Sequence, residues 1–486
     1  MTHSPDDARK RGLTLLASCL GFVVVILDVS VVNVATKVLN KDFGSSLSGL
    51  EWVINGYTLT FAAFLLTTGA LGDRLAPKYV FQLGFALFAV TSLVCGLSVS
   101  LPMLIAARVV QGVGAAMIVP SSLSLVNGAF PDQAERTRAV SLWAASGGLA
   151  LALGPVIGGV LISLLGWRSI FLVNVPIAAI GIWLTAANAP GNLQATGGRR
   201  RSFDLPGQTL AVVCLGALTA GVVEANGLGW GSVTVTTCLA VFVLAAIGFV
   251  VAEGRSTDPM LPLRMFRHRA FTATALTGLL LNFSFYGLIF VFSLFFQSSW
   301  GYSPIVTGCA FLPMTAMIMV SNLACGPLTK RFGVRAVLVT GNAVGAAGYL
   351  AMLPAVHSGG GYAGIAVPFL VAGAGIGLVV PAMTNAMLAA AEPGTAGIAS
   401  GVLNGSRQIG GLIGVAVMGL LVGDSSAASF VSGLRSALVC AAVALAAGIA
   451  LGALGVRPAP RRTLATAGPE PVTVPAAPAA VDEPVD

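Results

Sequence analysis

Fourteen apolar segments, each long enough to cross a lipid bilayer, recur along the 486-residue chain. A membrane-spanning helix needs about 20 predominantly apolar residues. Backbone polar groups find no water in hydrocarbon, so such segments form helices. The sequence therefore predicts an all-α integral membrane protein with 14 transmembrane helices. The segments are 12–37, 50–71, 79–100, 102–129, 137–164, 169–189, 205–225, 232–252, 270–297, 304–328, 336–355, 362–390, 399–422 and 433–455.

The composition excludes a soluble protein. Only 9% of the residues are charged and 56% are hydrophobic, whereas about a quarter of a soluble domain is charged. The net charge of +8 does not indicate a nucleic-acid partner, because the Lys and Arg residues lie in short connections between apolar segments. The seven Cys and three His are scattered without metal-binding spacing, so we expect no metal site and no cofactor.

The basic residues predict the orientation of the chain. Of the 26 Lys and Arg, 20 fall on the side of the N-terminus, four on the opposite side, and two, Arg108 and Arg407, inside apolar segments. Cytoplasmic connections of membrane proteins carry an excess of Lys and Arg. We therefore expect both termini in the cytoplasm.

Two motif pairs indicate a duplicated unit. "GALGDRLAPK" at 69–78 is similar to "GPLTKRFGVR" at 326–335, and "GVGAAMIVP" at 112–120 is similar to "GAGIGLVVP" at 373–381. The offsets are nearly the same, so the chain divides into two six-helix halves with two inserted helices. Such repeats are typical of transporters. The predicted parts are a cytoplasmic N-terminus (1–11), an N-terminal half (12–189), a linker (190–204), two inserted helices (205–252), a second linker (253–269), a C-terminal half (270–455) and a disordered cytoplasmic tail (456–486).

Six motifs stand out along the chain. They are "LDVSVVNVA" (27–35), "GALGDRLAPK" (69–78), "RVVQGVGAA" (108–116), "GPVIGG" (154–159), "WRSIFLVNVP" (167–176) and "NGSRQIGG" (404–411). Through these motifs the chain resembles the fourteen-helix drug:proton antiporters of the major facilitator superfamily over nearly its full length. The loop motif departs from the family pattern at Ala76 and Pro77, where a Gly and a basic residue are usual, and Ser30 replaces the commoner Thr.

This resemblance implies a major facilitator fold (6+2+6 helices) and a proton-coupled efflux antiporter rather than an enzyme. The expected partners are a hydrophobic or amphipathic drug or antibiotic, protons and the lipid bilayer. We expect the proton-motive force as the energy source, no obligate protein partner, and a location in the bacterial cytoplasmic membrane. Within the family the chain is most similar to actinomycete exporters of self-made antibiotics.

Two alternatives stay open at this point. A metabolite importer, working as a symporter or uniporter, would have the same fold. A non-transporting membrane sensor would need an extramembrane signalling domain, and no connection is long enough to hold one.

Asp28 and Arg108 are the candidate proton-coupling residues. A carboxylate within a membrane segment is costly and indicates a functional site, and Asp28 is the only acid well inside any segment. We expect it to exchange a proton near neutral pH or to contact a cationic drug; a structural hydrogen bond is the alternative. Arg108 lies in the same outer half and stays protonated, so we expect the two side chains to approach in at least one state and expel the proton. A static buried pair is the alternative.

Two further motifs predict conformational roles. Asp73 and Arg74 fall in the expected cytoplasmic loop between the second and third segments, where Asp73 is predicted to cap a helix or latch the inner side. The Gly-rich "GPVIGG" lies within a segment, where small residues allow close helix packing and proline favours a kink. Gly154, Pro155, Gly158 and Gly159 are the predicted seam, with plain helix packing as the alternative.

Polar residues on apolar helices form the predicted substrate cavity, although any polar face lining a path would look similar. Arg407 is expected to bind a substrate carboxylate or to tie helices together. The candidates are Trp52, Asn55, Gln111, Asn282, Tyr286, Ser293, Gln297, Thr315, Asn322, Arg407 and Gln408.

Overall fold

The computed structural model describes residues 5–189, 204–256, 259–358, 361–391, 396–423 and 427–456. Each of the fourteen predicted segments coincides with one helix or with two consecutive helices. The N-terminal bundle contains α1 (Pro5–Phe43), α2 (Leu47–Leu75), α3 (Pro77–Gly96), α4 (Leu101–Ala129), α5 (Gln133–Leu165), α6 (Ser169–Leu172) and α7 (Asn174–Asn188). Next come α8 (Leu205–Leu228), α9 (Val233–Arg255) and the 3₁₀-helix η1 (Leu263–Arg267). The C-terminal bundle contains α10 (Arg269–Ser298), α11 (Pro304–Ala310), α12 (Leu312–Phe332), α13 (Val334–Ala351), α14 (Leu353–Ser358), α15 (Ala363–Ala390), α16 (Ala396–Val422) and α17 (Ala427–Gly455).

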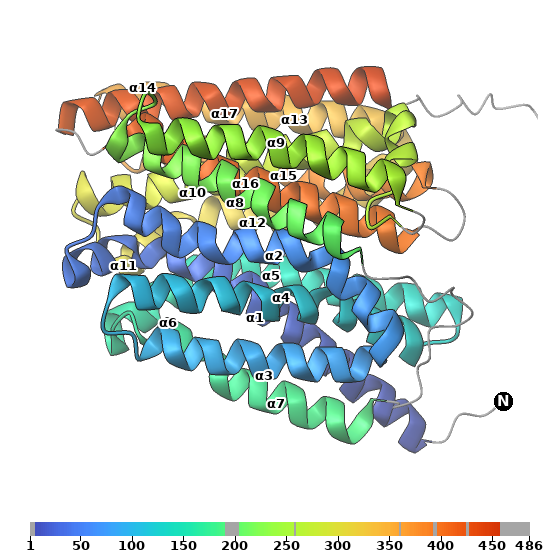
Figure 1. Ribbon diagram of the computed structural model, residues 1–486. Helices are drawn as coiled ribbons and strands as arrows, with labels where there is room; N and C mark the ends of the chain where they lie inside the picture. Colours follow the sequence, from blue (N-terminus) through green and yellow to red (C-terminus); the bar gives the residue numbers. More distant parts are fainter. Residues whose placement is uncertain are drawn as a thin grey trace, which may run out of the picture.

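The helices lie side by side along one direction (Figure 1), in two bundles with matching contacts. α1 packs on α4, α5 and α7, and α10 packs correspondingly on α15, α16 and α17. Likewise, α4 packs on α2 and α3 as α15 packs on α12 and α13. This correspondence matches the internal repeat in the sequence.

Twelve spans in the described part of the chain are long and apolar enough to cross a membrane. α5 is a thirteenth if its two parts, bent by 46° between residues 150 and 153, count as one span. Pro155 accounts for the bend, because it has no N–H to donate to the carbonyl of residue 151 and its ring crowds that carbonyl. The remaining predicted segment is α2; that it crosses the membrane, and hence the count of fourteen, stays a prediction. The predicted linker at 190–204 and the predicted tail at 456–486 fall almost wholly outside the described residues.

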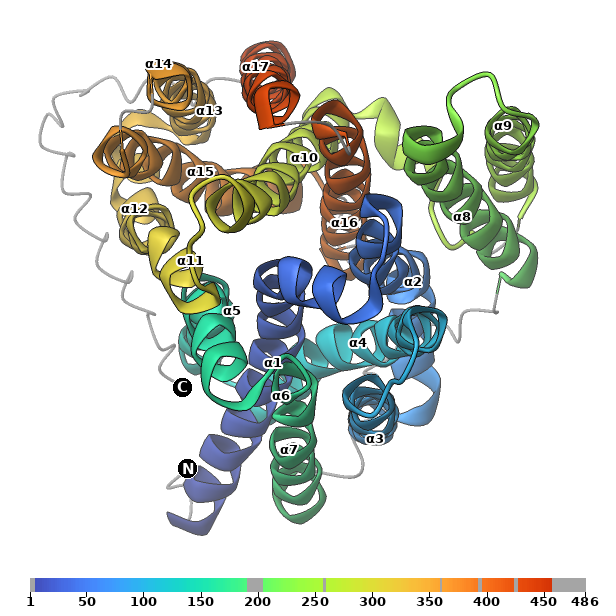
Figure 2. The same cartoon turned by 90° about the vertical axis from the view of Figure 1, so that its left-hand side faces the viewer.

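The inserted pair α8–α9 stands at the flank of the two bundles (Figure 2). α8 packs on α9 and also touches α2 and α16, one helix from each bundle. Its contact with α16 is apolar: Val222 and Val223 cluster with Ala416, next to Val417. α9 contacts α8 and η1 and exposes much of its apolar surface, as expected of a helix that faces lipid.

The two bundles are joined at the end of the molecule that carries the α1–α2 connection. Ser293 at the end of α10 donates to the carbonyl of Asn33 at 2.6 Å, and Gln297 Nε2 donates to the carbonyl of Val34 at 3.1 Å. Lys37 Nζ donates to the carbonyl of Gln297. These three hydrogen bonds join α1 to α10 near the C-termini of both helices.

The α2–α3 junction corrects one expectation. α2 continues to Leu75 and α3 begins at Pro77, so Asp73 and Arg74 lie in the last helical turn and not in a loop. The cap position of α3 is Ala76, which makes no side-chain cap hydrogen bond. The chain reverses direction at this single residue, whose φ is 63°. The side chains of Asp73 and Arg74 lie outside the described part, so their predicted latch role stays a prediction.

Ala76→Gly should stabilise the protein. A left-handed φ costs an L-residue about 1–2 kcal/mol, and the extra freedom of glycine in the unfolded chain offsets roughly 0.5–1 kcal/mol of the gain. We expect a higher apparent melting temperature in detergent. Ala144→Gly, on an exposed face within α5, is the matched control and should lower it; a decrease for both variants would contradict strain at Ala76.

Candidate functional site

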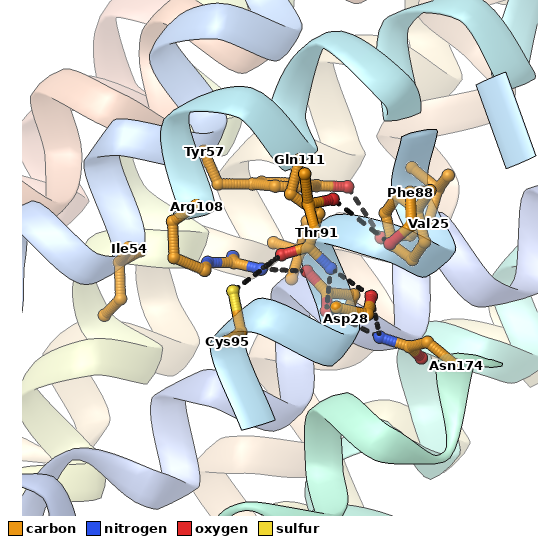
Figure 3. A network of polar contacts seen from close by, with 12 residues as sticks. Val25, Asp28, Ile54, Tyr57, Phe88, Thr91, Cys95, Arg108, Gln111 and Asn174 are labelled. Atoms are coloured by element: carbon orange, nitrogen blue, oxygen red, sulfur yellow. Dashed lines mark hydrogen bonds and ion pairs between the residues drawn. The ribbon is translucent and has the colours of Figure 1, made fainter. Parts of the chain in front are cut away.

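A buried polar network surrounds Asp28 in the middle of α1 (Figure 3). The Asp28 side chain is 1% exposed and forms an ion pair with Arg108 of α4. Its second oxygen, Oδ1, accepts hydrogen bonds from Gln111 Nε2 at 3.2 Å and from Asn174 Nδ2 at 3.0 Å. All three contacts come from donors, so the arrangement suits an ionised carboxylate. The contact expected between Asp28 and Arg108 is present, and its role in proton coupling stays a prediction.

Four neighbours hold Arg108. Its Nε donates to the carbonyl of Val53 at 3.1 Å, and its Nη1 donates to Gln111 Oε1 at 2.7 Å as well as to Asp28. The guanidinium carbon lies 4.2 Å from the centre of the Tyr57 ring, within the range of a cation–π contact. The guanidinium therefore keeps neighbours when the Asp28 contact breaks.

Close helix packing brings these side chains together. A Cβ at Gly112 would collide with the carbonyl of Tyr57, and one at Gly114 would lie 3.0 Å from the backbone N of Phe88. Glycines at these two positions let α4 approach α2 and α3 closely, as small residues do in membranes. This approach places Arg108 within reach of the α2 backbone.

Two members of the network were missed by sequence reasoning. Asn174 begins α7 and Ser92 lies in α3; both are buried. Ser92 Oγ accepts from Gln111 Nε2 at 2.8 Å and from Asn174 Nδ2 at 3.3 Å. The only signal was that Asn174 stands in the motif "WRSIFLVNVP". Gln111 belongs to this network, and its expected place in a substrate cavity stays a prediction.

Asn174→Ala should lower the stability of the protein. The variant removes two donated hydrogen bonds, one of them to Asp28, and a bond to a charged group contributes about 1.5–3 kcal/mol. We expect a lower apparent melting temperature in detergent. The control is Asn188→Ala in the same helix, because Asn188 bonds only to the carbonyl of Leu184 at 2.8 Å among the described contacts. Equal effects of the two variants would argue against the network.

The "GPVIGG" stretch of α5 packs between α1 and α11. A Cβ at Gly154 would collide with Ser30 Oγ, and one at Gly158 would lie 2.8 Å from Val31 Cγ1, both on α1. On the opposite side, a Cβ at Gly159 would lie 2.5 Å from the carbonyl oxygen of Pro304. Gly308 of α11 faces the Pro155 carbonyl in the same way. The stretch therefore lies at a close contact between the two bundles.

Arg407 meets part of the expected polar face of α10. Its Nε donates to Asn282 Oδ1 at 3.5 Å, and the ring of Tyr286 lies against Gly411, one turn further along α16. Gln408, the next residue after Arg407, is buried. This is a second polar group, built from the C-terminal bundle.

The other cavity candidates lie apart from this group. Ser293 and Gln297 bond to the α1 backbone, as described above. Thr315 is buried and bonds to the carbonyl of Phe311 in the preceding turn at 3.1 Å. Asn322 of α12 faces Gly148 of α5, with its Nδ2 3.8 Å from where a Cβ would stand. The structure therefore does not gather the predicted residues into one cluster.

The start of α2 holds a third polar group. Trp52 Nε1 donates to Glu224 Oε1 of α8 at 2.9 Å, so the indole faces the inserted pair. Asn55 is fully buried, and neither atom of its amide has a hydrogen-bond partner among the described residues. Glu51 is also fully buried and lies against Gly419 of α16. Glu51 is thus a second buried carboxylate, but it lies near the start of α2, whereas Asp28 lies in the middle of α1.

Comparison with known proteins gives matches over most of the chain. A family model described as the Major Facilitator Superfamily matches residues 18–415. A methylenomycin A resistance protein of Streptomyces coelicolor is 39% identical over 415 residues, covering 85% of this chain and 86% of the relative. The tetracenomycin C resistance and export protein of Streptomyces glaucescens is 35% identical over 413 residues, covering 84% and 75%. The cephamycin export protein CmcT of Amycolatopsis lactamdurans is 35% identical over 417 residues, covering 85% and 86%.

Solved structures share the fold at low sequence identity. A bacterial homologue of the human lysosomal transporter Spinster, in an inward-facing and unoccupied conformation, has a TM-score of 0.64 at 17% identity, covering 93% of this chain and 98% of that one. A D-xylose–proton symporter has a TM-score of 0.64 at 12% identity, covering 90% and 96%. At these identities the likeness concerns the fold alone.

Proposed function

The chain belongs to the major facilitator superfamily and is a multi-pass membrane transporter, not an enzyme, and from this premise we propose that it is a proton-coupled antiporter that exports drugs or antibiotics. The observation that carries the proposal is the ion pair of Asp28 and Arg108 in the core of the N-terminal bundle. A buried carboxylate beside a permanent cation can exchange a proton by making and breaking the pair. The names of the relatives, which include export and resistance proteins for three antibiotics, support efflux.

We propose the topology that the basic residues predict. In it, α2 and the bent α5 complete fourteen spans, both termini are cytoplasmic, and residues 12–189 and 270–455 form six-helix halves around the inserted helices at 205–252. The end that carries the α1–α2 connection then faces outward. Since hydrogen bonds join α1 and α10 at this end, the conformation described is closed to the outside.

The proposed cycle follows from the Asp28 contacts. A proton that arrives from the outside binds Asp28 and removes the charge that Arg108 neutralises. Arg108 keeps its bonds to the Val53 carbonyl and to Gln111, so the broken pair leaves no bare guanidinium. When the bundles rock to close the outside, the ion pair forms again and the proton leaves Asp28 toward the cytoplasm. The ion-paired, outwardly closed conformation corresponds to the state after this release.

We propose that the substrate is a hydrophobic or amphipathic antibiotic, and that Arg407 and Asn282 contact it from the C-terminal bundle. Leu403 and Met383 lie with Arg407 around Gly278, and the Tyr286 ring lies against Gly411. Apolar and aromatic groups beside a cation suit an amphipathic molecule with a polar or anionic group. The proton-motive force is the proposed energy source, and the proposal requires no cofactor or protein partner.

The test is expression in a bacterium that lacks its major drug pumps. We expect increased resistance to some antibiotic classes, and we expect a proton uncoupler to abolish the drug efflux measured in the same cells. Everted vesicles, which expose the cytoplasmic side, should accumulate the drug when acidified inside. Accumulation that ignores the uncoupler would overturn proton coupling, and drug uptake into intact cells would favour an importer.

A further inference from the structure

Two carboxylates meet where α8 begins and α9 ends, on helices that take no part in the Asp28 network. Asp204 is the N-cap of α8, and its Oδ1 accepts the N–H of Gly207 at 2.8 Å. Glu253 lies in the last turns of α9 and is 3% exposed, and its Oε2 accepts the N–H of Leu261 at 3.0 Å. Each carboxylate therefore uses one oxygen to hold the backbone.

The remaining oxygens converge on the same space. A Cβ at Gly207 would lie 2.8 Å from Asp204 Oδ2 and 2.8 Å from Glu253 Oε1, so the two oxygens are at most twice that distance apart. Both are buried, and neither has a hydrogen-bond partner in the described part of the chain. A side chain at position 207 would collide with both oxygens, and glycine avoids this collision.

Two ionised carboxylates are unfavourable in this arrangement. Like charges that share a site repel each other, and this repulsion favours a bound proton. Among the cations of the adjoining segments, Arg255 and Arg267 have exposed side chains, and Arg264, which is also exposed, interacts with another group. None of the ion pairs between described side chains involves Asp204 or Glu253. At the neighbouring end of α2, the side chains of Asp73 and Arg74 lie outside the description.

A proton fits this site better than a metal ion. Calcium takes six to eight oxygen ligands and magnesium takes six, and no group of three His, Cys, Asp or Glu side chains among the described residues could hold a metal. A proton needs only two oxygens. We propose that Asp204 and Glu253 bind one proton between Oδ2 and Oε1, and that this proton ties the start of α8 to the end of α9.

The site sits beside the contact of the inserted pair with α2. Gln208 Nε2 donates to the carbonyl of Ala63 at 3.1 Å, and Thr67 donates to Gln208 Oε1 and to the sulfur of Met260, the latter at 3.3 Å. Loss of the proton makes the two carboxylates repel each other at this contact. The attachment of α8 and α9 to the rest of the protein is then weaker at alkaline pH.

The test uses two variants that keep the backbone hydrogen bonds. Asp204→Asn preserves the cap, since asparagine caps helices as well as aspartate does, and Glu253→Gln keeps an oxygen for the Leu261 N–H. The apparent melting temperature of the full chain in detergent is measured from acidic to alkaline pH. A site that binds its proton more tightly in the folded state stabilises at low pH, and this stability is lost as pH rises. We expect that loss in the parent protein, and a flatter profile in Glu253→Gln, whose amide donates to Asp204 without a titrating proton.

The double variant completes a cycle whose coupling should change sign. The two residues should stabilise each other at acidic pH and destabilise each other at alkaline pH. Glu135→Gln, at an exposed ion pair with Arg11, is the control and should change neither profile. Parallel profiles for the parent and Glu253→Gln would overturn the proposal, as would stabilisation by added Na⁺, Mg²⁺ or Ca²⁺ that Glu253→Gln abolishes. Since the readout is stability, the result does not depend on whether the protein exports drugs.

Discussion

Asp28→Asn should abolish uncoupler-sensitive efflux while the protein still reaches the membrane. The amide cannot carry the transported proton. It also leaves Arg108 without its counter-charge, and breaking a buried ion pair costs about 3–5 kcal/mol. Both contacts of Oδ1 come from donors, so the new NH₂ group faces either these donors or Arg108. Efflux in intact cells, with and without a proton gradient, measures the effect.

Two companion variants separate lost coupling from lost folding. Asp28→Glu keeps a titratable group and should retain part of the uncoupler-sensitive efflux. Asp42→Asn, at the end of the same helix, removes a half-exposed carboxylate that pairs with Arg168 at 3.2 Å, and it should behave like the parent protein. If Asp28→Asn is folded and still exports the drug, and if the uncoupler stops this export by collapsing the proton gradient, Asp28 is not the coupling site.

Gly159→Ala should slow transport by about tenfold or more. Its methyl group would lie 2.5 Å from the Pro304 carbonyl oxygen and 2.6 Å from Ile305 Cα. Both are backbone atoms, which cannot turn aside as a side chain does. Overpacking of this kind costs about 1–3 kcal/mol, and it penalises the conformation in which α5 and α11 touch. The bundles should therefore spend less time in the conformation that brings α5 against α11.

Cysteine labelling measures this shift in conformation. A cysteine at Ser293, buried at the α1–α10 contact, should react faster with an impermeant thiol reagent from outside when Gly159→Ala is present. The experiment needs a background without the native cysteines. Gly148→Ala in the same helix is the control, because its methyl group would lie at an ordinary 3.8 Å from Asn322 Nδ2. Equal labelling and equal transport in the two variants would exclude α5–α11 closure as a limiting contact.

Much of the helical framework could be predicted because each helix carries its own signal. Spanning length and the positions of Lys and Arg depend on local sequence, so the segments at 102–129 and 270–297 match α4 and α10 almost residue for residue. The Asp28–Arg108 contact could also be anticipated, because a buried charge needs a partner and few are available within the membrane. Breaks were harder to predict: α11 ends and α12 begins within the segment 304–328.

The cavity residues show what local patterns cannot supply. A polar stripe gives the direction of a side chain but not the neighbour that it meets. In the structure, Trp52 donates a hydrogen bond to Glu224 of an inserted helix, and Gln297 donates one to the backbone of α1. Asn174 was missed because an asparagine at a helix start is ordinary in sequence, and its function as a donor to Asp28 depends on how α7 packs against α1.

The flanking position of α8 and α9 bears on how a hydrophobic substrate would reach the proposed exporter from the lipid. The two bundles meet along two seams, one at α2 and α16 and the other at α5, α11 and α12. The inserted pair covers the first seam (Figure 2). Val222 and Val223 of α8 pack on α16, and Trp52 of α2 donates to Glu224 of α8. In the described part of the chain, no corresponding pair covers the second seam. For the exporter proposed above, a compound dissolved in the bilayer would approach two unlike sides, one covered by α8 and α9 and the other formed by α5, α11 and α12.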